Sequence, residues 1–123
     1  MLLQWLDVRL ARAGLLIAAI AITVLALMPA TEVPITTSWD KLDHWLAFFT
    51  LSFLANHSFP QRSYWRVIAV ALVAYGIGIE LAQWITPDRD ADAMDVVADS
   101  IGIVIYGAVL FARRWLVAPQ RAE

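Results

Sequence analysis

Ionisable side chains occur in this chain at positions where the surrounding sequence is apolar. Glu80 and Gln83 lie near the end of one apolar segment, and Asp95 and Asp99 lie at the start of the next. His44 lies in the first turn of another apolar segment. Because an ionisable group inside a membrane helix is energetically expensive, residues of this kind usually mark a functional site.

Three chemical roles suit these residues. Glu80, Asp95 and Asp99 offer the hard oxygen ligands that a divalent cation prefers, and they are the candidate metal ligands. His44 or Glu80 can serve as a general base. Glu80 can instead carry a proton. The chain has no cysteine, which excludes disulfides and thiolate chemistry.

The composition places these residues in a membrane protein. Of the 123 residues, 61% are hydrophobic and 16% are charged, against about 45–50% and about 25% in an average soluble domain. The length fits one domain, over residues 1–123. We therefore predict an all-α, polytopic protein of the cell membrane.

Four apolar segments predict a bundle of four transmembrane helices. They cover residues of about 10–30, 41–59, 65–86 and 94–116. At 1.5 Å per residue, each can cross the roughly 30 Å of hydrocarbon in a bilayer. The connections contain prolines, and Pro87 ends the third segment.

Lysine and arginine are distributed unevenly between the two predicted sides. Seven of nine lie in the first segment, the second loop and the tail: Arg9, Arg12, Arg62, Arg66, Arg113, Arg114 and Arg121. Only Lys41 and Arg89 lie on the other side. Because cytoplasmic loops are rich in these residues, we expect both termini in the cytoplasm. The tryptophans mark the same two interfaces, with Trp5, Trp65 and Trp115 at inner ends and Trp39, Trp45 and Trp84 at outer ends.

This topology brings the unusual polar residues to one depth near the outer surface. His44, Asp95 and Asp99 fall in first turns, and Glu80 lies about 7 Å below the outer end of its helix. We expect them to meet. On the third helix, one face carries Gly76, Glu80 and Gln83, and the opposite face carries Ala74, Gly78 and Ala82. Small residues on the second face predict that the helix has neighbours on both sides.

The outer side carries a large negative charge. Its two cations, Lys41 and Arg89, stand against nine acids and leave a formal charge of -7. The acids are Glu32, Asp40, Asp43, Glu80, Asp88, Asp90, Asp92, Asp95 and Asp99. Carboxylates at this density share protons or recruit a cation.

The order and spacing of these residues resemble the VanZ-like membrane proteins over residues of about 40–107. The matching residues are Asp40, Lys41 and His44 opening a span, Glu80 and Gln83 closing another, and Arg89, Asp92 and Asp95 leading into a glycine-containing helix. The resemblance implies a small multi-helix protein of the cell membrane, associated with resistance to glycopeptide antibiotics such as teicoplanin, without an established biochemical activity. Two positions differ from the family pattern: Asp99 stands where Asn is usual, and Asp88 where Gly is usual.

The predicted functional cluster is Asp40, Lys41, His44, Glu80, Gln83, Arg89, Asp92, Asp95 and Asp99. Structural roles are the alternative for its members. Carboxylates at helix starts act as caps, which applies to Asp40, Asp43 and Asp95. Arg89 and His44 can simply partner neighbouring acids, and the Glu80–Gln83 pair can form hydrogen bonds between helices.

Three function classes stay open. The first, which we favour, is a non-catalytic envelope factor that binds a lipid headgroup, a cell-wall precursor or a glycopeptide at an outer acidic pocket. The second is a metal-assisted enzyme acting on a lipid-linked phosphate, with a divalent cation as cofactor. The third is a small proton-coupled transporter. In all three the bilayer is the partner rather than a nucleic acid. Four short helices around a polar pocket bury little surface, which makes a homo-oligomer plausible.

Overall fold

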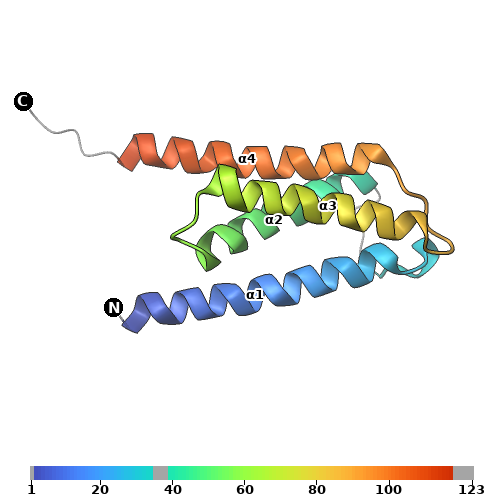
Figure 1. Cartoon of the computed structure of the whole chain (residues 1–123), viewed down its shortest axis with the longest axis horizontal. Coiled ribbons are helices and arrows are strands. Elements are labelled where there is room, and N and C mark those ends of the chain that lie inside the picture. The colour runs from blue at the N-terminus through green and yellow to red at the C-terminus, as the bar shows by residue number, and fades with distance from the viewer. Residues whose placement is uncertain (1, 35–38, 118–123) are drawn as a thin grey trace, which may run out of the picture.

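The structure, a computed structural model, describes residues 2–34 and 39–117, with side chains from residue 7 onward. Within these ranges the fold is all-α and contains no strand. Its helices are α1 (Leu2–Leu27), α2 (Asp40–Ser58), α3 (Ala69–Trp84) and α4 (Ala93–Val117), with a 3-10 turn at Ala30–Glu32 and a π-helical turn, η2, at Tyr64–Ile68. Helix α1 begins and α4 ends at the same end of the bundle (Figure 1). The side chain of Trp5, and Arg121, lie outside the described residues.

Three helices of the described chain are long and apolar enough to cross a membrane. These stretches are Asp7–Leu27, Tyr64–Trp84 and Ala93–Val117. Helix α2 does not meet this criterion, because polar residues occupy both of its ends. It is instead the interior helix, which packs against α4 and α1. That α2 crosses the membrane, and that both termini lie in the cytoplasm, stay predictions.

The observed bounds differ from the expected ones mainly at the starts of α1 and α3. Helix α1 begins at Leu2 rather than near residue 10, because the residues before Arg12 are mostly good helix formers and include no Gly or Pro. The third apolar segment begins with the η2 turn. Ser63 precedes that turn, and its Oγ accepts a hydrogen bond from the Arg66 N–H at 3.4 Å.

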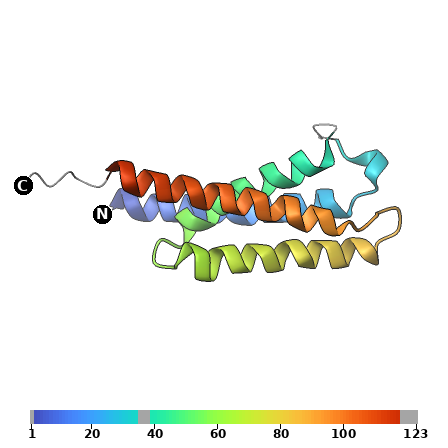
Figure 2. The same cartoon turned by 90° about the horizontal axis from the view of Figure 1, so that it is seen from above.

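Helix α2 runs at a slant to the other three helices (Figures 1 and 2). Its first half approaches α4 so closely that a Cβ atom on Gly102 would lie 2.4 Å from the carbonyl oxygen of Trp45. Its last turn lies on α1, where Arg12 Nε donates to the carbonyl oxygen of Ser58 at 3.1 Å. Helix α2 therefore diverges from α1 at one end and from α4 at the other.

The core lies between α2, α3 and α4. Phe48, Leu51 and Ile103 are at most 2% exposed, and Tyr64 reaches across to donate to the Ile103 carbonyl oxygen at 2.6 Å. Polar groups deeper in the bundle pair with each other. Thr23 Oγ1 lies 2.7 Å from the hydroxyl of Tyr75, for example. Such pairs satisfy groups that hydrocarbon cannot.

The faces of α3 correct one expectation from the sequence. Gly76, Glu80 and Gln83 are buried, as their common face predicts. Most of the small-residue face has no neighbour within the described chain, because Ala74 and Gly78 are exposed and a Cβ on Gly78 would meet no atom within 4 Å; only Ala82 is half-buried. The prediction that α3 is packed on both sides is therefore wrong for this single chain. The homo-oligomer stays a prediction.

The loop between α3 and α4 contains a backbone conformation that favours glycine. Asp88 has a φ of 60°, the only positive φ at a non-glycine residue in the described chain. This left-handed region is costly for side chains branched at Cβ. This positive φ explains why Gly is usual at this position in the family that the chain resembles.

We expect Asp88→Val to lower the free energy of unfolding by about 1–2 kcal/mol and Asp88→Gly to have little effect, because only Val is strained at this φ. Denaturant titration of the purified variants measures the difference. Asp90→Val is the control in the same loop, where φ is not positive. Equal effects of Val at both positions would show that side-chain character, not backbone strain, matters.

Candidate functional site

Two rows of charged side chains face each other where α2 and α4 begin. Lys41 and His44 lie on α2, and Asp92, Asp95 and Asp99 follow a helical spacing into α4. Lys41 Nζ donates to Asp92 Oδ2 at 2.6 Å and to the Asp95 carboxylate. His44 Nε2 lies 3.4 Å from Asp95 Oδ2, and His44 Nδ1 lies 2.9 Å from Asp99 Oδ1. We call these five residues the α2–α4 ladder.

The ladder runs from the surface into the bundle. Side-chain exposure falls from 48% at Asp92 and 31% at Lys41 to 14% at His44, 5% at Asp95 and 2% at Asp99. A buried charge is unfavourable unless a partner lies beside it. Because acids alternate with bases along the ladder, each buried carboxylate has such a partner. The sequence spacing predicts that His44 and Asp99 meet, and the structure brings them together.

Glu80 contacts the loop before α4 rather than the ladder side chains. Its Oε2 accepts a hydrogen bond from the backbone N–H of Asp92 at 2.9 Å, and its Oε1 has no hydrogen-bond partner. His44 and Asp99, which we expected it to meet, lie within electrostatic range of its carboxylate. Glu80 therefore fastens the start of α4 to α3.

Asp92 is the cap of α4. Its Oδ1 accepts a hydrogen bond from the Met94 N–H at 2.8 Å, which is the capping role that sequence spacing allowed for Asp95. The Lys41 ammonium, and then the Met94 N–H, hold the pKa of the Asp92 carboxyl below its ordinary value. Asp92 therefore stays ionised at neutral pH and available to Lys41.

Gln83 and Arg89 play different parts. Gln83 is 1% exposed, and its Nε2 donates to the carbonyl oxygen of Ala26 at 3.0 Å. This is a hydrogen bond between α3 and α1, the structural alternative considered for Gln83. Among the described residues, the ion pairs at this end of the bundle use Lys41 rather than Arg89. Arg89 Nε is buried without a hydrogen-bond partner.

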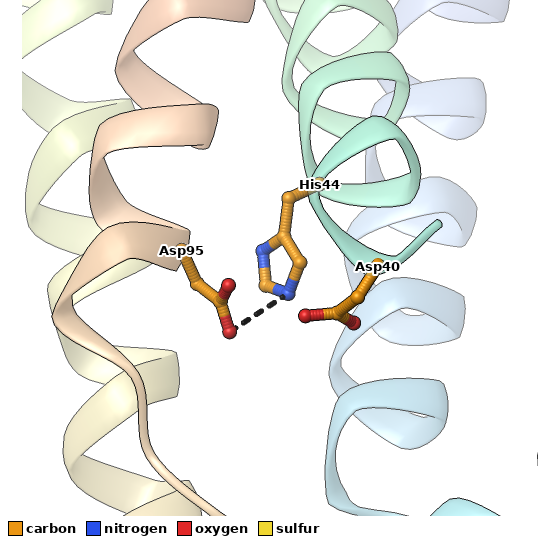
Figure 3. Close-up of side chains that lie close together, drawn as sticks. All are labelled: Asp40, His44 and Asp95. Carbon is orange, nitrogen blue, oxygen red and sulfur yellow. Dashed lines mark ion pairs between the residues drawn. The ribbon is translucent and has the colours of Figure 1, made fainter. Parts of the chain in front are cut away.

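Asp40, His44 and Asp95 form a group that could hold a metal ion. One ligand atom from each lies within 4.8 Å of the others, and Figure 3 shows both carboxylates beside the His44 ring. The Asp99 contact orients the ring, since metal-binding histidines usually donate their second N–H to a carboxylate. This set shares only Asp95 with the candidate ligands from the sequence. The Lys41 ammonium, 3.6 Å from Asp40 Oδ2 and bonded to Asp95, already supplies a positive charge.

A cavity of about 240 Å³ lies beside this group, where α2 diverges from α1. Its apolar lining comes from three helices and includes Ile22, Leu25, Phe48 and Ile79. Its polar lining is Asp40, Asp43, His44 and Arg89. Ligand pockets for whole drug-sized molecules occupy about 300–1,000 Å³, so this space suits a headgroup or an amino sugar rather than a complete lipid or glycopeptide.

Two parts of this cavity lie outside the predicted cluster. The sequence predicts Asp43 as one of the outer acids and as a helix cap, but not as a member of the cluster. Its spacing from Asp40 and His44 places all three on one side of α2 and could have indicated a shared role. The α1 residues carry no polar signal, and only the packing of α1 against α2 brings them to the site.

Comparisons with known proteins identify the family of the chain. No curated protein and no solved structure matches the chain. The family model described as VanZ/LLP1 matches residues 17–116, which include all four of the observed helices in whole or in part. With a match over most of its length, and with helices suited to a membrane, this chain belongs to the VanZ/LLP1 family.

Proposed function

We propose that the protein is a non-catalytic factor of the cell envelope that binds an amine-bearing amphipathic molecule at the outer end of its helix bundle. The observation that carries the proposal is the cavity of about 240 Å³, which joins an apolar wall to a charged rim. An amphipathic ligand satisfies both surfaces at once. Its headgroup lies at the rim, and its tail follows the apolar helices into the lipid.

The rim favours a cationic group. Asp40 and Asp43 line it together, and they face an end of the protein with a large formal excess of acids. Lys41 bonds to the deeper carboxylates of Asp92 and Asp95 and lies farther from the rim, at 3.6 Å from Asp40 Oδ2. An ammonium group beside two carboxylates gains charge-assisted hydrogen bonds. We therefore propose phosphatidylethanolamine-like headgroups, amine-bearing cell-wall precursors and glycopeptide amino sugars as the ligand class.

Arg89 adds a second element of recognition. Its Nε is a buried donor without a partner, and Arg89 lines the same cavity as the two acids. Arginine binds phosphate oxygens well because its donors form a planar fork. A headgroup with both an amine and a phosphate would use the acids and Arg89 together.

A binding experiment tests the proposal. The purified protein in detergent is titrated with phosphatidylethanolamine, with phosphatidylglycerol of the same acyl chains, and with a glycopeptide that carries an amino sugar. We expect the amine-bearing ligands to bind, and Asp40→Asn with Asp43→Asn to weaken them about tenfold, since losing two partly solvent-exposed charge contacts of about 0.7 kcal/mol each corresponds to that factor.

The matched control is Asp88→Asn with Asp90→Asn, which removes two charges from the nearby loop without changing the cavity lining. It should leave the affinity within about twofold. Equal weakening by both pairs would mean that the ligand is attracted by the overall negative charge of this end, not by contacts with Asp40 and Asp43. Equal binding of the two phospholipids would contradict the proposed amine recognition.

A metal-assisted enzyme is the second candidate, favoured by the grouping of Asp40, His44 and Asp95. In this role His44 Nε2 and the two carboxylates would hold a divalent cation, which would polarise a phosphoryl oxygen. Thermal stability with Mg²⁺, Mn²⁺ or Zn²⁺ and with chelator distinguishes the two. Saturable stabilisation that is lost in His44→Gln, together with release of phosphate from a lipid-linked pyrophosphate, would replace the first proposal.

The proton-coupled transporter remains a third outcome. For that role Glu80 would carry the proton, and its unpartnered Oε1 is the relevant observation. Deeper in the bundle than Glu80, the hydroxyls of Thr23 on α1 and Tyr75 on α3 form a hydrogen bond with each other. Proton flux into vesicles that contain the protein, lost in Glu80→Gln, would favour transport over binding.

A further inference from the structure

A second and larger cavity lies at the opposite end of the bundle. Its volume is about 1110 Å³. Helix α2 ends at Ser58, whereas α1 and α4 both extend beyond that point (Figure 1). Because α2 slants toward α1 at this end, its last turns no longer fill the space beside α4. The cavity is thus a consequence of the short, slanted α2.

The lining of this cavity is amphipathic. Apolar side chains from α1, α2 and α4 form its walls, including Leu10, Phe53 and Leu110. Trp65 also lines it, and its ring packs so closely on α4 that a Cβ on Gly107 would lie 2.2 Å from it. Large apolar walls that open at the end of a membrane bundle suit an acyl chain.

The charged part of the lining is mainly basic. Arg62 comes from the α2–α3 connection and Arg114 from the end of α4, and both line the cavity. None of the ion pairs among the described residues involves either arginine. Asp7 is the one acid in the lining. Guanidinium groups without a protein carboxylate partner are suited to phosphate oxygens.

We infer that this cavity is a binding site for one phospholipid with an anionic headgroup, held by Arg62 and Arg114. The acyl chain occupies the apolar walls, and the phosphate and headgroup lie between the arginines. The site is separate from the cavity at the other end and does not depend on the proposed function. It would fasten α1 to α4 where α2 is absent.

Native mass spectrometry tests the inference directly. The protein is released from micelles that contain equal amounts of phosphatidylglycerol and phosphatidylcholine. We expect one phosphatidylglycerol to remain bound, and Arg62→Gln with Arg114→Gln to reduce that bound fraction by about tenfold or more, since each substitution removes the charge-assisted hydrogen bonds of a guanidinium to the lipid phosphate, of about 1 kcal/mol or more per arginine.

The chain provides a matched control in Arg66→Gln with Arg113→Gln. This pair removes the same charge from the same end of the bundle, but neither residue lines the cavity. The bound fraction should stay within about twofold of wild type, because salt screens charges that do not contact the lipid. A similar loss in both pairs, or retention of both lipids equally in wild type, would overturn the inference and indicate a diffuse attraction.

Filling the cavity without changing its charge gives a second test. Ala11 lies in the lining on α1, and Ala11→Phe should reduce lipid retention in a protein that stays folded by circular dichroism. Retention at the wild-type level in a folded Ala11→Phe would contradict the placement of the acyl chain. Asp40→Asn with Asp43→Asn should leave this lipid in place, so the outcome is independent of the outer cavity.

Discussion

Gly102→Ala will lower the free energy of unfolding by about 1–3 kcal/mol, the usual cost of overpacking a tight contact. The added Cβ would lie 2.4 Å from the carbonyl oxygen of Trp45 and 3.0 Å from the backbone nitrogen of Phe49. Both are backbone atoms, so no side chain can move aside. Helices α2 and α4 must separate instead, and His44, next to Trp45, will lose its contact with Asp99.

Gly78→Ala is the control for this prediction. A Cβ at Gly78 would meet no atom within 4 Å, so alanine should be neutral or should stabilise α3 by up to about 1 kcal/mol. Unfolding in mixed micelles, followed by circular dichroism, measures both variants. If both glycine substitutions have the same effect, helix propensity rather than the approach of α2 to α4 is responsible.

Asp95→Asn will lower the free energy of unfolding by about 2–4 kcal/mol, because it removes a buried carboxylate that interacts with both Lys41 and His44 and takes part in charge-assisted hydrogen bonding. Asp95 is the centre of the α2–α4 ladder. Its carboxylate bonds to Lys41 and lies 3.4 Å from His44 Nε2, and its side chain is 5% exposed. The neutral amide keeps the shape, but Lys41 then pairs only with Asp92 and the exposed Asp40, and His44 only with Asp99.

Asp90→Asn provides the comparison, since Asp90 is an exposed acid of the same loop. Its effect should stay within about 0.5 kcal/mol, as for most surface substitutions. Thermal and denaturant unfolding of the two variants give the difference. A stable, wild-type-like Asp95→Asn would mean that the ladder does not hold α2 on α4, and that its acids are retained for another purpose.

These two predictions link stability to the candidate site. Gly102 lies one turn beyond Asp99 on α4 and sets the distance at which the ladder can form. The ladder in turn holds the start of α2, where Asp40 and Asp43 enter the outer cavity. A substitution that separates the two helices should therefore weaken ligand binding as well, even though it touches no cavity residue.

The contact between His44 and Asp99 shows how far patterns within single helices can predict a site. Apolar segments of membrane length place α2, α3 and α4 within a few residues of where they are observed, whereas α1 begins about eight residues earlier than expected. Charged residues at a spacing of three or four share a helix face, and opposite charges on neighbouring helices attract. These local rules suffice to bring His44 and Asp99 together.

Other contacts depend on the rotation and slant of helices, which local pattern does not specify. The sequence suggested Arg89 as the partner of the acids. In the structure, Asp92 and Asp95 pair with Lys41 instead, because of the depth at which α2 enters the bundle. The sequence also suggested that α3 is packed on both faces, whereas Gly78 is open in the single chain. Glu80 bonds to the loop backbone because that loop returns over the end of α3.

By itself, the sequence determined the class of protein, most of the helices, the residues that carry charge into the bundle and the resemblance to VanZ-like proteins. These properties follow from composition and from spacing along one helix. The tertiary structure alone decided the close approach at Gly102, the order of partners in the ladder and both cavities. Each arises from the slant of α2 between α1 and α4, and a crossing of this kind results from side chains packing across three helices at once.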